Sequence, residues 1–431
     1  MESLDRQKLE GAVRSYRAGL TDDALEMARD CLDGNEDVRL HAIVVIGESL
    51  LVAGRIDELG EHLVRFQEYR HDPRVELVSA RYSLRIGLID IARDQLFRLL
   101  AESTDRKLIR SASFDLVGIF DREGDYSTAW RIATEEHARS TREYPIDLLE
   151  KALAVTASAA EKAGRLKVRR ATRDVERTAF LAGVPRSGTS LLEQMLDRHT
   201  RIDGIGENSI PGNMADAIAA DGRAWPSGAQ SVPTHVLDHW QKRYHTMVRE
   251  SNGVPLECWS IDKTVFPMFQ PLAVACVLPG ARVVRIVRDA RDTAVSLLLS
   301  NMDPSWGWTS SMETIYRLIA AERAFVKPIM AGLGIENVEV RYERLVENPQ
   351  ASIELVLSLL DLDLEDACLR PHENPRVVMT LSNEQVRKPI NRQAIGRWKN
   401  YAPFMSETAL KNLEMANGSH DDSAVEAHHP A

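Results

Sequence analysis

The chain has 431 residues, of which 44% are apolar and 27% are charged, and its formal net charge is −10. A length of this size predicts two or more domains, and the composition is that of an ordinary globular protein. It argues against a disordered chain and against bulk binding of nucleic acid, so any basic site must be local.

The amino terminus and the cysteines indicate the compartment. Residues 1–14 alternate charged and apolar side chains and lack the apolar core of a signal peptide. No stretch approaches the ~20 apolar residues that span a bilayer. The cysteines lie far apart, without the spacing of a zinc site or a dense disulfide framework: Cys31, Cys258, Cys276 and Cys368. We therefore expect a cytoplasmic protein with no membrane or nucleic-acid partner and no metal site.

Four glycines recur in the amino-terminal part at intervals of 35, 33 and 37 residues: Gly19, Gly54, Gly87 and Gly124. Five residues after each glycine stands a small or apolar residue: Ala24, Leu59, Ala92 and Ala129. A repeat near 34 residues predicts paired amphipathic helices, in which glycine ends the first helix and the later residue lets the second pack closely. The pattern resembles a degenerate tetratricopeptide array. This resemblance implies a helical-repeat domain over residues 1–172 that binds a polypeptide or serves as a packing or dimerisation platform.

A basic run follows the repeats. Residues 162–177 carry seven Lys and Arg side chains against two acids. A nucleic-acid patch is one interpretation, and a solvated helix face leading into the second domain is the favoured one.

Residues 183–190 read Gly-Val-Pro-Arg-Ser-Gly-Thr-Ser, a phosphate-loop skeleton in which Thr189 replaces the usual lysine. An apolar run at 178–184 precedes the loop and an apolar helical pattern follows it, which predicts a strand, a loop and a helix. ATP hydrolysis needs the missing lysine and is disfavoured. The glycines and the helix amino terminus still favour an anion, and Arg186 supplies a positive charge.

Further strands are expected at 281–287 and 338–342, each followed by a helical pattern. This alternation predicts an α/β fold with a parallel sheet flanked by helices over residues 173–415, followed by a disordered tail at 416–431. Ligands of such sheets bind at the carboxyl ends of the strands, where Arg186, Arg288 and Tyr342 are expected. Ser296 lies eight residues, or about two helical turns, after Arg288, so its hydroxyl can face an anion beside that arginine.

A basic segment closes the domain. Residues 386–399 contain five Lys and Arg residues and no acid, inside an acidic protein. A flap over a polyanionic cofactor explains this bias, and a solvated basic helix is the alternative.

These motifs resemble those of the sulfotransferase family, in particular its tyrosylprotein and bacterial repeat-linked branches, over residues 178–401. The resemblance rests on the 185–190 loop, on Arg288 with Ser296, and on residues 206–207, 262–263, 341–343 and 386–398. It implies transfer of a sulfuryl group from 3′-phosphoadenylyl sulfate (PAPS) to a hydroxyl, without a metal. The implied PAPS-binding residues are Arg186, Ser187, Gly188, Thr189, Ser190, Arg288, Ser296, Tyr342, Arg387, Lys388 and Arg397.

The resemblance also implies three catalytic residues. Arg186 and Lys263 would stabilise the phosphosulfate bridge and the leaving group, and Glu207 would be the general base. His199 is a rival base, although its position favours a role in ending the helix after the loop. Trp306 and Trp308 either line an acceptor pocket or anchor an exposed loop.

The acceptor stays open. Tyrosylprotein enzymes often carry two adjacent acids where this chain has Glu207-Asn208, so a protein tyrosine presented by the repeats stands beside a carbohydrate or a small molecule. Selectivity is expected in segments such as 208–254. Two other classes are a kinase-like phosphotransferase, which the missing lysine disfavours, and a non-catalytic scaffold in which only the repeats bind a partner.

Overall fold

The structure is a computed structural model that describes residues 2–139, 144–163, 168–175, 177–207, 232–263, 270–304, 306–309, 311–374, 376 and 386–418. It divides into two compact units. Unit 1 comprises Met1–Ser140, Leu299–Asp303 and Pro375–Asn383, and unit 2 comprises Thr141–Leu298, Pro304–Asn374 and Glu384–Ala431. Within the described ranges, no helix is long and apolar enough to cross a membrane.

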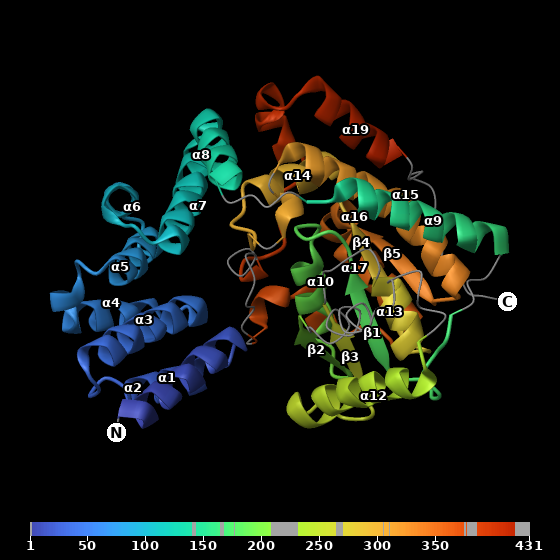
Figure 1. Ribbon diagram of the computed structural model, residues 1–431, viewed down its shortest axis with the longest axis horizontal. Helices are drawn as coiled ribbons and strands as arrows, with labels where there is room; N and C mark the ends of the chain where they lie inside the picture. Colours follow the sequence, from blue (N-terminus) through green and yellow to red (C-terminus); the bar gives the residue numbers. More distant parts are fainter. Residues whose placement is uncertain are drawn as a thin grey trace. The chain divides into compact units, whose positions relative to one another are not determined.

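Unit 1 is built from pairs of consecutive helices (Figure 1). The pairs are α1 (Glu2–Arg17) with α2 (Thr21–Arg29), α3 (Glu36–Ala53) with α4 (Ile56–Arg65), α5 (Pro73–Arg85) with α6 (Ile89–Glu102), and α7 (Arg106–Glu123) with α8 (Tyr126–Arg139). A 3-10 turn at Gln67–Tyr69 follows α4. The helix pairs predicted from the glycine spacing are confirmed.

The repeated glycines end the first helix of each pair in a left-handed conformation, with φ values of 79°, 76°, 81° and 80° in chain order. At Gly54 the glycine N–H donates to the Leu51 carbonyl (3.1 Å), and the Arg55 N–H donates to the Leu50 carbonyl (2.9 Å). The same pair of main-chain hydrogen bonds recurs at the other three glycines and satisfies the last carbonyls of each helix. Five positions after each glycine stands a fully buried residue, and three of these four residues are alanine, which is small enough for close packing of the second helix.

An ion-pair network joins the first helices of three pairs. Arg81 on α5 donates to Glu48 on α3 (2.8 Å) and to Asp115 on α7 (2.9 Å). Burial alone would lower the pKa of Arg81, but the two carboxylates outweigh it and raise the pKa above its usual value. The network therefore fixes how successive pairs stack.

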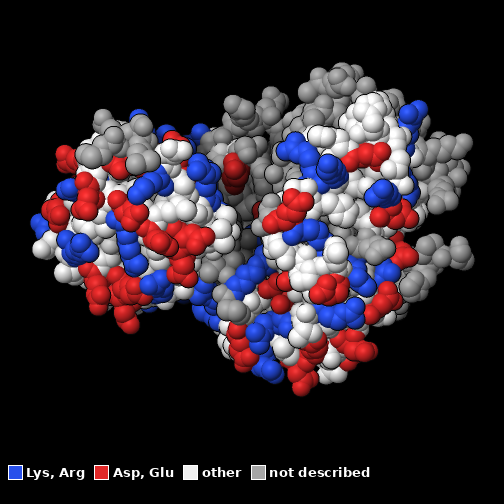
Figure 2. All heavy atoms as spheres, turned by 90° about the horizontal axis from the view of Figure 1, so that it is seen from below, with Lys and Arg blue, Asp and Glu red and all other residues white. Residues whose placement is uncertain are grey.

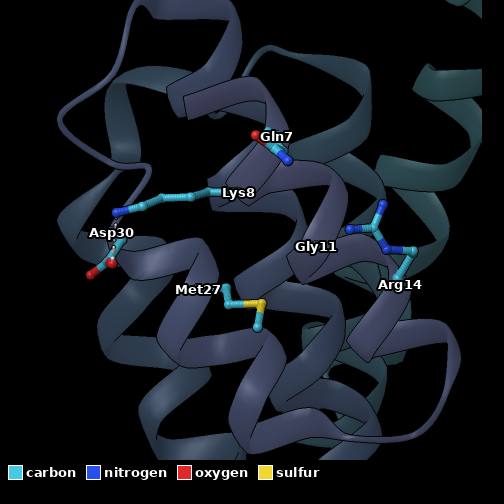
Figure 3. Close-up of a pocket in the computed structure, with 6 residues that line it drawn as sticks. All are labelled: Gln7, Lys8, Gly11, Arg14, Met27 and Asp30. Carbon is cyan, nitrogen blue, oxygen red and sulfur yellow. Dashed lines mark hydrogen bonds and ion pairs between the residues drawn. The ribbon is translucent and has the colours of Figure 1, made fainter. Parts of the chain in front are cut away.

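A pocket lies between α1 and α2 (Figure 3). Lys8 and Asp30 form an ion pair of 3.1 Å at its rim. Gly11 lets Met27 approach α1 closely, because a Cβ at Gly11 would lie 3.3 Å from the Met27 sulfur. On the face of the molecule in Figure 2, acidic and basic side chains are interspersed rather than gathered into one patch of either sign.

Unit 2 contains a parallel sheet, which has five strands in the part of the chain described. The strands are β1 (Thr178–Ala182), β2 (Ile202–Gly206), β3 (Trp259–Asp262), β4 (Arg282–Val287) and β5 (Asn337–Arg341), in the spatial order β2-β3-β1-β4-β5. Every neighbouring pair is parallel. The predicted α/β fold with a parallel sheet is confirmed.

Helices cover both faces of this sheet (Figure 1). The helices of this unit include α9 (Ile146–Ala163), α10 (Thr189–Leu196), α12 (Thr234–His245), α13 (Gln270–Val277), α14 (Ala290–Leu298), α15 (Met312–Leu333), α16 (Tyr342–Glu347), α17 (Pro349–Leu359) and α19 (Glu407–Gly418). Of these, α9 and α19 pack against α15. Strand residues alternate between the faces: Ala179 and Leu181 join a core with residues of α10 and α17, whereas Phe180 packs on Tyr244 of α12 at 6.0 Å between ring centroids.

A buried ion cluster lies on the face of the sheet that carries Phe180. Arg285 on β4, 1% exposed, donates to both carboxylate oxygens of Glu322 on α15, at 2.9 and 2.7 Å, and also to Glu339 on β5. Two carboxylates on one guanidinium satisfy a charge that burial would otherwise disfavour.

Several sequence-based expectations are wrong in detail. The basic run does not continue as one helix face: α9 ends at Ala163, and the described residues 168–175 form no helix. Arg170 instead donates to the Leu333 carbonyl (2.6 Å), and Arg177 donates to the Leu256 carbonyl (3.0 Å). These arginines serve main-chain acceptors rather than a solvated face.

The predicted tail begins too early. Residues 416–418 belong to α19, and the Asn417 side-chain oxygen accepts from the Ala290 N–H (2.8 Å) and from Arg323 (2.7 Å). This amide therefore caps α14, which the polar composition of the terminus did not indicate. Residues 419–431 lie outside the described residues.

Two further segments differ in secondary structure from the forms considered in the sequence analysis. The stretch expected to hold selectivity loops includes α12, while residues 208–231 lie outside those described. The basic closing segment forms no long helix between residues 386 and 400; its regular part is a 3-10 turn at Arg397–Asn400.

Candidate active site

A candidate site residue or loop follows the carboxyl end of each of these strands. Glu207 follows β2, Lys263 follows β3, the 183–188 loop follows β1, Arg288 follows β4 and Tyr342 follows β5. Because the strands are parallel, these ends share one edge of the sheet, where ligands of such folds bind. The structure thus gathers residues that lie far apart in the sequence.

The phosphate loop is pressed against its neighbours. A Cβ at Gly188, whose φ is 106°, would lie 2.4 Å from Cδ2 of Tyr342, and a Cβ at Gly183 would lie 2.5 Å from the Ile286 carbonyl oxygen. Arg186 has a φ of 71°, which is uncommon for a residue with a Cβ. Only glycine fits the two tight positions, and strain of this kind is concentrated at functional sites.

Arginine side chains gather around this loop. Arg186 Nε donates to Ser296 Oγ (3.1 Å), and Arg288 Nη1 donates to the Arg186 carbonyl (3.1 Å). The Arg288 guanidinium lies 4.9 Å from the centroid of the Tyr342 ring. Burial, together with the nearby charges of Arg288 and Arg397, lowers the pKa of Arg186 to about 10. Cations held this close in a buried place are stabilised by an anion between them.

Two polar atoms at the loop support the same interpretation. In the described part of the chain, Ser187 Oγ and Arg288 Nε are buried and have no hydrogen-bond partner. A buried polar atom without a partner costs roughly 1–3 kcal/mol. A phosphate or sulfate group, which offers several acceptor oxygens, would satisfy both donors, so these residues fit the 3′- and 5′-anionic groups of PAPS.

The closing segment is held by its main chain. Asp292 on α14 accepts from the N–H groups of Gly396 (2.7 Å) and Trp398 (2.8 Å). The guanidinium of Arg291 lies 4.1 Å from the centroid of the Trp398 ring. Arg397 is thereby fixed between two anchored residues, on the segment predicted to be a basic flap.

The other two predicted residues of the closing segment lie differently. Arg387 and Lys388 are exposed. Arg288 also donates to the Ala394 carbonyl, so the segment contacts the arginine cluster near residue 394. Of the three basic residues predicted to bind PAPS here, Arg397 is the one whose charge acts on Arg186.

Lys263 forms the centre of a second cluster. Its ammonium lies 3.0 Å from Glu207 Oε1 and 3.8 Å from Glu193 Oε2. Lys263 is 1% exposed, whereas half of the Glu207 side chain is exposed. A buried cation next to a solvent-reachable carboxylate is an arrangement suited to acid–base chemistry on a bound hydroxyl.

The remaining candidates fall outside these clusters. His199 is buried; its Nε2 lies 3.0 Å from the Asp363 carbonyl oxygen and its Nδ1 accepts from the Arg201 N–H (3.0 Å). Both ring nitrogens are thus engaged with the main chain, which argues against a role as base. Trp308 is fully buried and stacks on Trp306 at 5.8 Å between ring centroids, as in a loop anchored by one tryptophan.

Sequence reasoning missed two acids of the site, Glu193 and Asp292. Asp292 stands four residues after Arg288 and four before Ser296, so helical spacing places it on the same face. Glu193 is the one charged residue of α10, and Leu192 precedes it. The sequence thus places both acids beside the candidate residues, but only the packed structure shows that they are buried and what they contact. Among the described residues, no group of three or more His, Cys, Asp or Glu side chains could hold a metal ion.

The parallel sheet and the lysine-free phosphate loop define an α/β protein of the phosphate-loop type. A model of the sulfotransferase family matches residues 179–366, the part of the chain that contains most of this sheet. The likeness to this family is confined to these residues, which make up less than half of the chain.

Individual proteins show the same likeness. An "Uncharacterized protein" of Aquifex aeolicus is 25% identical over 311 residues, covering 69% of this chain and 40% of that protein. Protein-tyrosine sulfotransferase 2 of Gallus gallus is 24% identical over 251 residues, covering 52% and 63%. Protein-tyrosine sulfotransferase 1 of Danio rerio is 27% identical over 253 residues, covering 52% and 66%. The chain thus spans less than two thirds of each of these relatives.

Among solved structures, the sulfotransferase domain from the curacin biosynthetic pathway is 16% identical and matches with a TM-score of 0.41, covering 58% of this chain and 99% of that one. The sulfotransferase domain of the Synechococcus PCC 7002 olefin synthase matches with a TM-score of 0.40 at 17% identity, covering 59% and 99%.

Proposed function

We propose that the protein transfers the sulfuryl group of PAPS to a hydroxyl acceptor. The observation that carries the proposal is the convergence of Arg186, Arg288 and Ser296 at one edge of the sheet, beside two buried donors without partners. This edge suits the two anionic ends of PAPS. The 183–188 loop and the amino terminus of α10 would hold the phosphosulfate, while Arg288, Ser296 and Arg397 would hold the 3′-phosphate.

The reaction needs few groups. The acceptor oxygen forms a bond to sulfur while the bond from sulfur to the bridging phosphate oxygen breaks, releasing adenosine 3′,5′-bisphosphate. Glu207 takes the proton of the acceptor hydroxyl. Lys263 and Arg186 stabilise the negative charge that develops on the bridging oxygen and the leaving phosphate. The half-exposed position of Glu207 allows an acceptor to approach it from solvent.

The acceptor in this proposal is a tyrosine in a polypeptide, with a carbohydrate or a small phenol as the alternatives. The names of the Gallus gallus and Danio rerio relatives support the tyrosine. The helix pairs of unit 1 would serve to bind the polypeptide that carries it. The four cysteines are free and buried, in keeping with the cytoplasmic location proposed here.

Incubation with PAPS labelled in its sulfuryl group, together with tyrosine peptides, oligosaccharides and phenols, tests the proposal directly. The expected product is 80 daltons heavier than its acceptor, the mass of SO3. Arg186→Ala should reduce transfer by about 10²–10³-fold, the loss found when one charge-stabilising donor is removed. An absence of transfer to every acceptor class, together with no binding of adenosine 3′,5′-bisphosphate in calorimetry, would contradict the proposal.

A further inference from the structure

The buried ammonium of Lys263 lies near two carboxylates that differ in exposure. Glu207 Oε1 lies 3.0 Å from it and Glu193 Oε2 lies 3.8 Å from it. The Glu193 side chain is 2% exposed, like that of Lys263, whereas that of Glu207 is 50% exposed. The two acids therefore present one buried and one solvent-reachable negative charge to the same cation.

Glu193 also holds the backbone that carries Glu207. Its Oε1 accepts the N–H of Gly206 (3.1 Å), the last residue of β2, while the Gly206 carbonyl accepts the N–H of Lys263 (2.8 Å). Through its two oxygens, one side chain on α10 thus contacts the end of β2 and the lysine after β3. Since Glu207 directly follows Gly206, the same carboxylate sets the positions of both proposed catalytic groups.

The difference in exposure matters once a proton moves. When Glu207 takes the proton of an acceptor hydroxyl, it becomes neutral and no longer balances the charge of Lys263. A buried ammonium without a nearby anion is costly, so it would turn away from the leaving group toward solvent. Glu193 stays next to that ammonium throughout the transfer step.

We propose that Glu193 is a positioning residue for sulfuryl transfer, holding the Lys263 ammonium in place while Glu207 changes its charge. The inference rests on the proposed function. It extends that function by dividing the work of two acids: Glu207 exchanges the proton, and Glu193 keeps the cation directed at the leaving group.

Asp197, which directly follows the same helix, provides a matched control. It lies four residues after Glu193, and its carboxylate accepts hydrogen bonds from the Gly204 N–H in β2 (2.6 Å) and from the Asn374 side-chain amide (2.8 Å). Asp197 therefore also fixes β2 through a main-chain N–H. A residue that acts only by holding β2 should behave like Asp197.

The test compares Glu193→Gln, which keeps an acceptor for Gly206 but removes the charge, with Asp197→Asn, each alone and combined with Lys263→Ala. We expect Glu193→Gln to lower kcat by about 10- to 100-fold, below the ~10²–10³-fold loss for removing the lysine. Binding of adenosine 3′,5′-bisphosphate should change less than about threefold. Because Glu193 acts through Lys263, adding Glu193→Gln to Lys263→Ala should cause little further loss.

Asp197→Asn should instead combine multiplicatively with Lys263→Ala. If the losses from Glu193→Gln and Lys263→Ala also multiply, or if Glu193→Gln leaves kcat unchanged, the inference is wrong. Glu193→Asp, which keeps the charge on a shorter side chain, should recover part of kcat, and circular dichroism of each variant checks folding. Transfer by the unaltered protein separates the two proposals, because its absence overturns the proposed function and the role of Glu193 with it.

Discussion

Asp292 and Gly396, which lie 104 residues apart, are joined by a hydrogen bond of 2.7 Å from the glycine N–H to the carboxylate. The second oxygen of Asp292 accepts the N–H of Trp398 (2.8 Å), so the helix after β4 holds the closing segment on both sides of Arg397. Because these contacts are to main-chain groups, they depend on Asp292 and on the path of the closing segment rather than on its side chains.

Asp292→Ala should therefore weaken the proposed binding of PAPS without removing a residue that is proposed to contact it. Losing two hydrogen bonds to a buried carboxylate, each worth about 1.5 kcal/mol, should raise the Kd of adenosine 3′,5′-bisphosphate by about tenfold or more. Calorimetric titration measures the change. Glu313→Ala, on the exposed first turn of α15, is the control and should leave Kd unaltered; equal Kd values for both variants would refute the anchor.

The same anchor predicts a dependence on pH. Burial raises the pKa of Asp292, and the Trp398 N–H and the Arg288 charge offset this only in part. As pH falls through this raised value, Asp292 gains a proton, and one oxygen becomes a donor and loses an N–H partner. Affinity for adenosine 3′,5′-bisphosphate should therefore begin to fall above the usual aspartate range near about 3.9.

Asp292→Asn, which has one acceptor oxygen at every pH, should bind more weakly but with a flatter pH profile. The effect of this titration on the free energy of unfolding depends on pH in the opposite direction from its effect on affinity. A raised pKa means that the folded chain binds this proton more tightly than the unfolded chain, so this contribution is present at low pH and is lost as pH rises through the raised pKa. Identical pH profiles for the two proteins would exclude Asp292 as the titrating group.

Gly188→Ala should disrupt the phosphate loop. The new Cβ would lie 2.4 Å from the Tyr342 ring, at a φ of 106° that alanine rarely adopts. We expect a loss of about 3 kcal/mol in the free energy of unfolding, together with loss of adenosine 3′,5′-bisphosphate binding. Gly253→Ala is the matched control, since it has a φ of 68° but open space around it, and it should cost only about 1 kcal/mol and leave binding intact.

Two alanine substitutions on α7 should change stability in opposite directions. Gly124, with a φ of 80°, ends the helix, and a Cβ there meets nothing within 4 Å, so Gly124→Ala should cost about 1 kcal/mol from backbone strain alone. Gly118 lies inside the helix and has room for a Cβ, so Gly118→Ala should increase the free energy of unfolding by about 0.5–1 kcal/mol. Urea unfolding of both variants measures the difference, and the same sign for both would contradict it.

The local requirements of the fold were predictable. A left-handed helix end is a demand that one residue type meets, so the glycine spacing predicted the helix pairs of unit 1. Apolar runs likewise predicted β1, β4 and β5. The sequence did not indicate β2 or β3, because Ile202–Gly206 contains two glycines and Trp259–Asp262 contains two polar residues. Pairing with neighbouring strands, rather than local propensity, makes these segments extended.

The candidate site likewise contains residues that sequence motifs predicted and residues that only the packed structure shows. Arg186, Arg288 and Ser296 lie in or beside short motifs, so sequence spacing could bring them together, although their roles stay predictions. The part played by Glu193 and Asp292 depends on burial and on partners elsewhere in the chain. An acid on a helix has the same local sequence whether it faces solvent or a buried backbone N–H, and only the packed structure distinguishes the two.

Arg288, Asp292 and Ser296 follow one another at intervals of four residues along one stretch of chain at α14. This stretch therefore behaves as a single transferable module: a cation, an anchor for the closing segment and a hydroxyl keep their mutual spacing wherever the helix is placed. A chimera that exchanges residues 282–298 as one block with the matching block of a relative would keep all three in register. One that divides this block would separate the proposed anion-binding residues from the residue that anchors the closing segment.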